Sequence, residues 1–287
     1  MAGNHRPRLT DAGKPATFEV EAFNERGEMV PTAIAGESPL TLYLDKREIV
    51  TLMTLGQAPE ALALGYLRNQ RLVGSVEEIA AVQVDWETES VVVTTRKRTP
   101  KKTTALKSKL KKRTVTTGCG QGTMFGNLME EIDGVKLRDD VMLSDAQLVV
   151  LVDKVRKYET IYKQSGAVHG CALAAKSDDG AEILMFVEDV GRHNAVDAIA
   201  GFMWLEGIDG SDKIFYTTGR LTSEMVIKCA QMGIPFLVSR SGLTKMGHEI
   251  AKRTGITMLG RASGRHYLLF TGGQRMIRTT PQATAIA

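Results

Sequence analysis

The sequence predicts an α/β protein, with a layered and mainly parallel sheet in its C-terminal part and a smaller α+β domain ahead of it. From residue 171 onward, short apolar runs alternate with segments of helical periodicity, which is the order expected of α/β layers. Between residues 17 and 50, apolar and polar residues alternate instead, as they do in half-buried strands.

The first domain is expected to cover residues 16–113, after a disordered tail at 1–15. Residues 59–69 predict a helix, because Pro59 suits a first helical position and leucines recur at helical spacing. The apolar runs 82–86 and 91–95 flank a polar turn and predict a hairpin. The domain ends in a basic segment, 96–113, which we expect to be mobile.

The second domain is expected to cover residues 114–273, followed by a tail at 274–287. Ser144 and Gln147 have the spacing of a capping box and predict the start of a long helix that continues to Tyr162. The elements that follow are strands near 171–175, 183–187, 213–217, 235–239, 256–260 and 266–270, and helices near 194–205, 222–232 and 243–254.

Length and composition indicate a soluble protein of one or two domains. No apolar run is long enough to cross a bilayer, and residues 1–15 have no apolar core of the signal-peptide kind; we therefore expect a cytoplasmic protein without a membrane partner. Three scattered cysteines do not form a disulfide framework.

The net charge of +4 conceals an uneven distribution. Ten Lys and Arg residues and no acid lie between Arg96 and Arg113, and subtracting these ten from +4 leaves −6 for the remainder. The segment has no interleaved aromatic residues, so stacking on nucleic acid bases is unsupported. A solvated loop, or a clamp on an acidic partner or an anionic ligand, is favoured over nucleic acid binding.

The densest group of polar side chains lies in residues 188–195, between an apolar run and a helical segment. It contains Glu188, Asp189, Arg192, His193 and Asn194. Open α/β sheets bind ligands at the carboxyl ends of their strands. A simple connection between a strand and a helix does not need five such side chains, so we interpret this turn as a site.

Three further arginines follow predicted strands. Arg220 comes just before a helix N-terminus, where backbone amides attract anions, and Arg261 and Arg265 lie in the predicted loop 260–265. Together with Arg192 they favour a polyanionic ligand such as a nucleotide diphosphate. The sequence has neither a Walker A motif nor a Gly-x-Gly-x-x-Gly after a strand.

Cys119 lies between two glycines, beside the basic segment. Nearby cations lower a thiol pKa and favour the nucleophilic thiolate; a half-buried structural cysteine is the alternative. Cys171 and Cys229 are expected in the core. A zinc site built from Cys119, His169 and Cys171 lacks a fourth ligand, so no metal is expected, and His169 is interpreted as a polar residue that lines the ligand crevice.

These motifs resemble the FdhD-type formate dehydrogenase accessory sulfurtransferases over residues 18–271. The resemblance rests on the Cys119 loop and on segments 165–169, 188–197, 218–226, 234–239 and 255–260. It implies a cytidine-deaminase-like fold without zinc, usually dimeric. It also implies that Cys119 accepts persulfide sulfur from a cysteine desulfurase and passes it to the molybdenum cofactor, in its bis-guanine-dinucleotide form, for formate dehydrogenase or a related molybdoenzyme.

The resemblance also implies roles for individual residues. The catalytic residue would be Cys119, and guanine nucleotides would mimic half of the cofactor. The family's cofactor-binding loop corresponds to Gly260, Arg261, Ala262, Ser263, Gly264 and Arg265. Because of their own places at strand ends or in the crevice, the residues expected to bind the same cofactor also include Arg220, Arg192, His193, Asn194 and His169.

The sequence departs from the family pattern at three positions. Gly122 stands where the family has the second cysteine of a Cys-x-x-Cys pair, Leu243 where a proline is common, and Cys171 where a small residue is frequent. Persulfide chemistry needs one thiolate and survives the first change. A chaperone that binds the guanylylated cofactor without carrying sulfur is the alternative function; a nucleic-acid-binding deaminase relative is a third, against which the missing zinc ligands argue.

Overall fold

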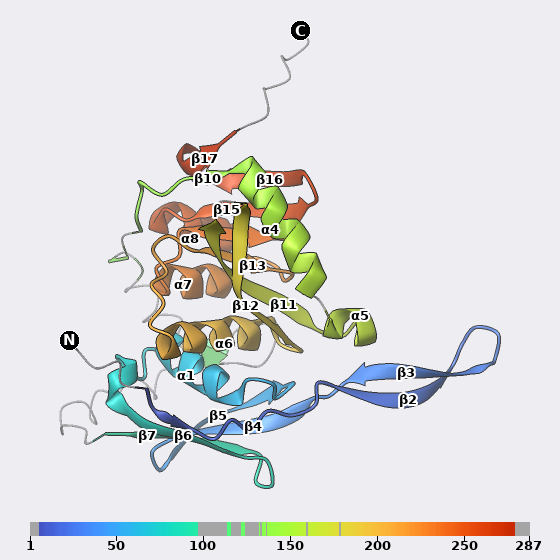
Figure 1. Cartoon of the computed structure of the whole chain (residues 1–287). Coiled ribbons are helices and arrows are strands. Elements are labelled where there is room, and N and C mark those ends of the chain that lie inside the picture. The colour runs from blue at the N-terminus through green and yellow to red at the C-terminus, as the bar shows by residue number, and fades with distance from the viewer. Residues whose placement is uncertain are drawn as a thin grey trace. The chain divides into compact units, whose positions relative to one another are not determined.

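The computed structural model describes residues 6–96, 114–115, 122–123, 132, 134–135, 137–158, 160–177 and 179–278. The chain divides into two compact units (Figure 1). The first comprises Met1–Ile132, Glu159–Cys171 and Val187–Ile208, and the second comprises Asp133–Tyr158, Ala172–Phe186 and Asp209–Ala287. Each unit is thus assembled from separated stretches of sequence, whereas the sequence predicts two contiguous domains.

The first unit contains a five-stranded sheet in the order β1-β6-β7-β4-β5. Strands β6 and β7 form the predicted hairpin, in antiparallel register, and α1 begins and ends at the predicted residues. The strands of this sheet are β1 (Arg8–Leu9), β4 (Ser38–Leu44), β5 (Arg47–Thr54), β6 (Ile79–Asp85) and β7 (Ser90–Thr95). The other elements of the unit are the hairpin of β2 (Thr17–Phe23) and β3 (Met29–Ala35), and α1 (Pro59–Asn69), η1 (Val76–Glu78), α5 (Ile161–Ser165) and α6 (Arg192–Leu205).

The prediction of a disordered tail at 1–15 is wrong for its second half. Arg8 and Leu9 pair in parallel with β6, and Thr10 bonds to the backbone of Val82 and Val84. The Trp86 indole donates to the carbonyl of Ala12. These partners lie more than 70 residues away along the chain, which is why the local sequence gives no sign of them.

Helices α1 and α6 cross with their backbones in contact. A methyl group at Gly65 would lie 1.6 Å from the carbonyl oxygen of Asp197, and one at Gly201 would lie 1.8 Å from that of Ala61. Asn69 Nδ2 donates to Asp197 Oδ1 at 2.7 Å, inside the crossing. Only glycine permits this approach, so these residues fix the position of α6 and of the turn that precedes it.

The larger sheet has the order β12-β11-β13-β14-β15-β16, and α4, α7 and α8 belong to the second unit. Strands β13, β14 and β15 are parallel, and β16 is antiparallel to β15. The elements are α4 (Asp145–Tyr158), β11 (His169–Ser177), β12 (Gly180–Asp189), β13 (Ile214–Thr217), α7 (Ser223–Gln231), β14 (Phe236–Ser239), α8 (Lys245–Thr254), β15 (Thr257–Ser263) and β16 (His266–Thr271). The chain is therefore a mixed α/β protein with the predicted alternation.

The short elements β8 (Thr114–Val115), β9 (Gly122–Thr123) and β10 (Leu143–Ser144) lie between the two large sheets in the sequence, and η2 (Gly273–Arg275) and β17 (Met276–Ile277) follow β16. Ser144 Oγ accepts from Gln147 N at 3.1 Å and Gln147 Oε1 accepts from Ser144 N at 3.0 Å. The predicted capping box at the start of α4 is confirmed.

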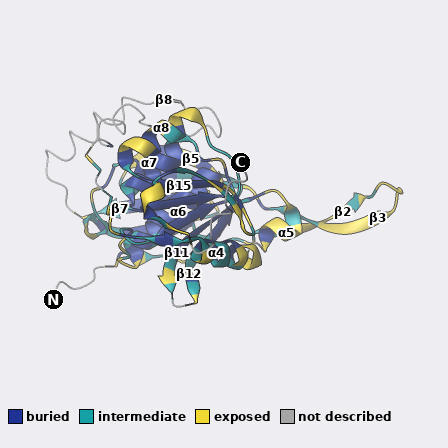
Figure 2. Cartoon of the chain, turned by 90° about the horizontal axis from the view of Figure 1, so that it is seen from above, coloured by how far each residue is buried: buried dark blue, intermediate teal, exposed yellow. Residues whose placement is uncertain are grey.

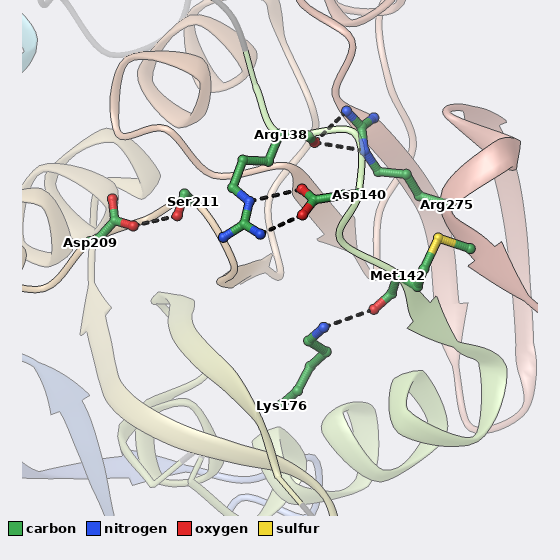
Figure 3. Close-up of polar contacts among 7 residues, drawn as sticks. All are labelled: Arg138, Asp140, Met142, Lys176, Asp209, Ser211 and Arg275. Carbon is green, nitrogen blue, oxygen red and sulfur yellow. Dashed lines mark hydrogen bonds and ion pairs between the residues drawn. The ribbon is translucent and has the colours of Figure 1, made fainter.

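The predicted tail at 274–287 begins too early. Strand β17 pairs with β10, and the Arg275 side chain is buried. Arg275 donates to the carbonyl of Arg138 at 2.6 and 3.0 Å (Figure 3). It also donates to the carbonyl of Gly255 at 2.5 Å. Arg138 in turn holds Asp140 through two parallel hydrogen bonds, which raise the pKa of Arg138. Residues up to Ile277 thus complete the second unit.

Gly201→Ala should destabilise the first unit. The added methyl would overlap the Ala61 carbonyl of α1, and such overpacking typically costs about 1–3 kcal/mol or more. Thermal unfolding monitored by circular dichroism measures the effect. Gly242→Ala is the matched control, because nothing lies within 4 Å of a methyl there; equal melting temperatures for both variants would contradict the close crossing.

Candidate functional site

The turn between β12 and α6 is organised by the buried carboxylate of Asp189. Its Oδ2 accepts from Thr54 Oγ1 at 2.5 Å and from Leu55 N at 3.1 Å, and its Oδ1 accepts from Gly191 N at 2.9 Å and Asn194 Nδ2 at 2.8 Å. Burial raises the pKa of Asp189 above its ordinary value, and the four donors oppose this shift. The carboxylate therefore joins the end of β5 to the start of α6.

Asn194 completes this link from the helix side. Its amide nitrogen also donates to the carbonyl of Met53 at 2.6 Å, so both amide hydrogens are directed at fixed acceptors. Gly191 precedes the helix as its N-cap, with the Asn194 side chain packed 3.0 Å from where a methyl at Gly191 would lie. The predicted site turn is a rigid polar scaffold.

The adjacent carboxylate, Glu188, binds the start of helix α5 and not the start of α6. It accepts from the backbone amides of Thr160, Ile161 and Tyr162 at 3.1, 2.9 and 2.9 Å. It thereby satisfies the free amides of the first turn of α5. The predicted single helix to Tyr162 is wrong, because α4 ends at Tyr158 and a new helix begins at Ile161 where this carboxylate binds.

Arg192 is buried, with 6% of its surface exposed, at the first turn of α6. Its Nε has no hydrogen-bond partner in the part of the chain that the structure describes, and the ion pairs found there do not involve it. Burying a charge without a partner is costly. A buried guanidinium at the N-terminal, positive end of a helix can bind an anion.

A cavity of about 240 Å³ opens beside the turn, within the first unit. His193 and Asn194, both expected to bind ligand, line it together with Gly191 and Val190. The opposite lining comes from β5 and the residue just before β4: Glu37, Thr51, Leu52 and Met53. Sequence reasoning missed these residues, because the alternating pattern of a half-buried strand does not indicate that it faces a turn about 140 positions later in the chain.

In the second unit the ends of three neighbouring strands lie side by side. Ser239 Oγ donates to the carbonyl of Gly219 at 2.6 Å, and Arg261 N donates to the carbonyl of Ser241 at 2.9 Å. This brings the segment of Arg220 and the segment that begins at Gly260 to one edge of the sheet, as predicted. Arg220, Arg261 and Arg265 are exposed there.

The predicted loop at 260–265 is largely a strand. Strand β15 continues to Ser263, with an irregular register after Gly260 and a positive φ of 53° at Arg261. Gly264 and Arg265 form the turn into β16, and Ala262 is buried. The bulge at Arg261 lets the hairpin continue past the point where apolar alternation stops.

His169 is the first residue of β11 and is half-buried, and Cys171 and Cys229 lie in the core as expected. Cys119 and most of the basic segment lie outside the described residues. Among the described residues there is no group of three His, Cys, Asp or Glu side chains that could hold a metal. None of the helices in these ranges is long and apolar enough to cross a membrane.

Comparison with known proteins assigns the chain to a family. The model of the FdhD/NarQ family matches residues 35–277, and the chain belongs to this family. The chain is 29% identical to the sulfur carrier protein FdhD of Wolinella succinogenes over 240 residues, covering 84% of this chain and 81% of that protein. It is 28% identical to the sulfur carrier protein FdhD of Listeria monocytogenes, covering 90% and 95%.

A solved structure agrees with this assignment. The chain resembles a crystal structure described as a formate dehydrogenase accessory protein from Desulfotalea psychrophila, with a TM-score of 0.72 and 26% identity. The match covers 92% of this chain and all of the other. The predicted resemblance is therefore confirmed at the level of the family and of a mixed α/β fold.

Asp189→Asn should destabilise the protein by roughly 2–4 kcal/mol, because an amide nitrogen would face two donors that now have an acceptor. Because the folded-state pKa of Asp189 is raised, its contribution to stability is complete below the unfolded value of about 3.9 and is lost as the pH rises through the folded value. The loss of stability in the variant should shrink as the pH rises, measured by urea unfolding across a pH series.

Asp85→Asn is the control of opposite sign. Asp85 is exposed, and its pKa is lowered, chiefly by the hydrogen bond from the Glu87 amide. The small loss in the free energy of unfolding caused by Asp85→Asn should grow as the pH rises, whereas the loss caused by Asp189→Asn should shrink. The same pH trend in both variants would contradict the assigned environment of Asp189.

Proposed function

We propose that this protein is a cytoplasmic sulfurtransferase of the carrier type. Cys119 accepts persulfide sulfur from a cysteine desulfurase and delivers it to the molybdenum cofactor, bound in its bis-guanine-dinucleotide form as a substrate, for the maturation of formate dehydrogenase. Membership of the FdhD/NarQ family and relatives named as sulfur carriers support this. The single structural observation that supports the ligand part of the proposal is the buried Arg192, which has no ion-pair partner within the described ranges.

The two halves of a guanine nucleotide match different residues of the first unit. A diphosphate supplies the negative charge that Arg192 lacks. Arg192 does not itself line the cavity, although its neighbours Gly191 and His193 do. The lining includes one acid, Glu37, which favours a base with donors over a second phosphate. Guanine presents two adjacent donors, N1–H and the 2-amino group, to a carboxylate, whereas adenine presents an acceptor and a donor. His193 and Asn194 line the same cavity and complete this half of the proposed site.

The second unit has cationic groups of its own that can bind an anionic part of the cofactor. Arg220, with the segment Gly260, Arg261, Ala262, Ser263, Gly264 and Arg265, supplies exposed cations and backbone amides at one sheet edge of the second unit. His169, at the start of β11, is also proposed as a cofactor-binding residue. Exposed arginines at strand ends attract polyanions and remain able to move with them.

The sulfur-accepting step needs one thiolate. The Cys119 thiolate attacks the terminal sulfur of the desulfurase persulfide, the sulfur–sulfur bond of the donor breaks, and the desulfurase cysteine leaves as a thiolate. The product is a persulfide on Cys119, with no net oxidation. The basic sequence next to Cys119 favours the thiolate form of this residue.

Delivery of the sulfur as sulfide requires two electrons. A second cysteine in the loop could supply them by forming a disulfide with Cys119, but Gly122 occupies that position. An external thiol must therefore attack Sγ of Cys119, release hydrosulfide and form a mixed disulfide, which a second thiol reduces. The proposed carrier thus depends on a thiol reductant from its surroundings.

A cofactor chaperone without sulfur chemistry is the second candidate function, since the Arg192 turn and the cavity serve it equally well. The homodimer implied by the family resemblance is part of the proposal for either function. Dependence on Cys119 separates the two.

Cys119→Ala should abolish the mass gain of one sulfur atom that the protein shows after incubation with a cysteine desulfurase and cysteine. Loss of the thiol removes the acceptor, so formate dehydrogenase activation should be lost as well. Intact-protein mass spectrometry measures the first effect. Cys229→Ala, at a buried cysteine of α7, should keep both activities; full activation by Cys119→Ala would instead establish the chaperone.

Arg192→Met and Glu37→Gln should weaken nucleotide binding in different ways. Arg192→Met removes the charge for any diphosphate and should weaken GDP, IDP and ADP alike, by roughly ten- to a hundredfold. Glu37→Gln removes the acceptor for guanine alone, so the preference of the protein for GDP over ADP should fall about tenfold. Isothermal titration calorimetry measures both.

Glu48→Gln is the matched control for Glu37, since Glu48 lies on the exposed side of β5 and is absent from the cavity lining. This variant should bind all three nucleotides as the unaltered protein does. If Glu37→Gln still prefers GDP over ADP, the base does not bind in this cavity. If Arg192→Met binds the nucleotides with unchanged affinity, the diphosphate does not bind at the start of α6.

A further inference from the structure

Strands β2 and β3 form a ribbon, here called the arm (residues 17–35), that extends away from the rest of the first unit (Figure 1). The strands pair without interruption over seven residue pairs, from Thr17 with Ala35 to Phe23 with Met29. They belong to a sheet of their own, because β2 and β3 have no further strand beside them among the described residues.

The turn at the end of the arm is well ordered. Asn24 Oδ1 accepts from the amides of Arg26 and Glu28 at 2.9 and 3.0 Å, and Gly27 adopts the positive φ of 76° that the turn requires. Asn24 Nδ2 also donates to Glu28 Oε2 at 2.9 Å. The arm is therefore a preformed ribbon with a defined register.

One face of the arm is apolar and carries no charge. The register places Phe18 opposite Ile34, Val20 opposite Thr32 and Ala22 opposite Val30, and opposed residues share a face. Phe18 is 53% exposed and Ile34 48%. Figure 2 shows the arm largely in the colour of exposed residues, whereas most of the strands of the two large sheets are buried. The other face carries Glu19 and Glu21, and then Phe23 and Met29 near the turn, at 75% and 58% exposed.

The base of the arm is held in place. Helix α5 packs against β3 and β2, Thr17 Oγ1 donates to Gln164 Oε1 at 3.4 Å, and the Phe18 ring covers Gly36. Beyond this base, an isolated two-stranded ribbon with an uncovered apolar face is marginally stable in water. Such a patch marks an interaction surface.

We propose that the arm packs, through its apolar face, against a second copy of this chain. Pro31 supports face packing over strand addition. A proline stays in a continuous ladder when its missing N–H is directed at the free edge, so the free edge of β3 lacks a donor in its middle. A strand added there would lose a hydrogen bond, whereas the charge-free face can be covered without burying a carboxylate.

The area of the arm favours a second copy over a different partner. A seven-residue strand is about 24 Å long and two strands are about 10 Å wide, so one face projects about 240 Å². A partner that covers one arm thus buries about 480 Å² on both surfaces together, far below the ~1,200 Å² of a stable interface. A two-fold symmetric pair in which each arm packs on the body of the other chain covers two arms and buries about 960 Å², close to the lower limit of a specific interface.

This inference rests on the proposed function for the existence of the dimer and adds the surface that forms it. The test is sedimentation velocity over a concentration series. The protein should sediment at twice 31.3 kDa, and the double variant Val20→Lys with Ile34→Lys should raise the dimer dissociation constant roughly a hundredfold or more, because each lysine would be buried without a partner. p-Benzoylphenylalanine at position 32 should crosslink two copies of the chain on irradiation.

Met246→Lys is the matched control, since Met246 is also 48% exposed but lies on α8; its dimer should be unaffected. Replacing residues 19–33 by Asn-Gly should also give a monomer, which excludes a misfolded arm as the cause. GDP affinity is measured on every variant, so that a failed nucleotide site is distinguished from a failed arm. A protein that is monomeric throughout, a dimer that survives both arm variants, or crosslinks to a desulfurase and not to a second copy would each overturn the proposal.

Discussion

The close crossing of α1 and α6 is the constraint on which the first unit depends. Gly65 and Gly201 remove the side chains that would hold two helices apart, so peptide groups of one helix touch peptide groups of the other. Most helix pairs are separated by about 8–10 Å and tolerate small shifts through their side chains. Here the contact is between backbones, which adjust far less. Because α6 begins at Arg192, the crossing determines where the site turn stands, and Asn69 and Asp197 add a polar bond that fixes the rotation of one helix on the other.

Two adjacent carboxylates, Glu188 and Asp189, hold different elements of the site turn in place. Glu188 holds the first turn of α5 through three amides, and Asp189 holds the end of β5 and the start of α6 through four donors. Both acids are satisfied by neutral donors, so neither neutralises the buried Arg192 that follows them. The outcome is a rigid polar frame that contains the buried Arg192, for which the described residues supply no ion pair, and whose turn lines a cavity of about 240 Å³. This arrangement suits a protein that binds an anionic group in a fixed position, as either a carrier or a chaperone of a nucleotide-bearing cofactor must.

Local sequence signals predicted the elements that depend on local physics. The helix at Pro59, the β6–β7 hairpin and the capping box at Ser144 follow from caps, turns and periodicity. The concentration of polar residues at 188–195 correctly indicated an unusual turn, and its role as a binding site stays a prediction. The predictions that failed depend on distant partners. Arg8 pairs with a strand more than 70 residues away, Arg275 bonds to Arg138, and the break before Ile161 is made by Glu188. The role of Thr51 and Glu37 in the cavity likewise depends on which strand the folded chain brings to α6.

Helix α5 connects the turn at Glu188 with the base of the arm. Its first turn is held by Glu188, one residue from the Asp189 junction, and its side packs on the base of the arm. Five residues of helix therefore separate the proposed ligand-binding turn from the proposed subunit contact. Thermodynamic linkage makes any communication along this path symmetrical: the factor by which an occupied site tightens the pair of subunits equals the factor by which pairing tightens the site. Where the coupling is favourable, such a carrier holds its cargo more firmly as a dimer than as a monomer, and dilution to monomers promotes release.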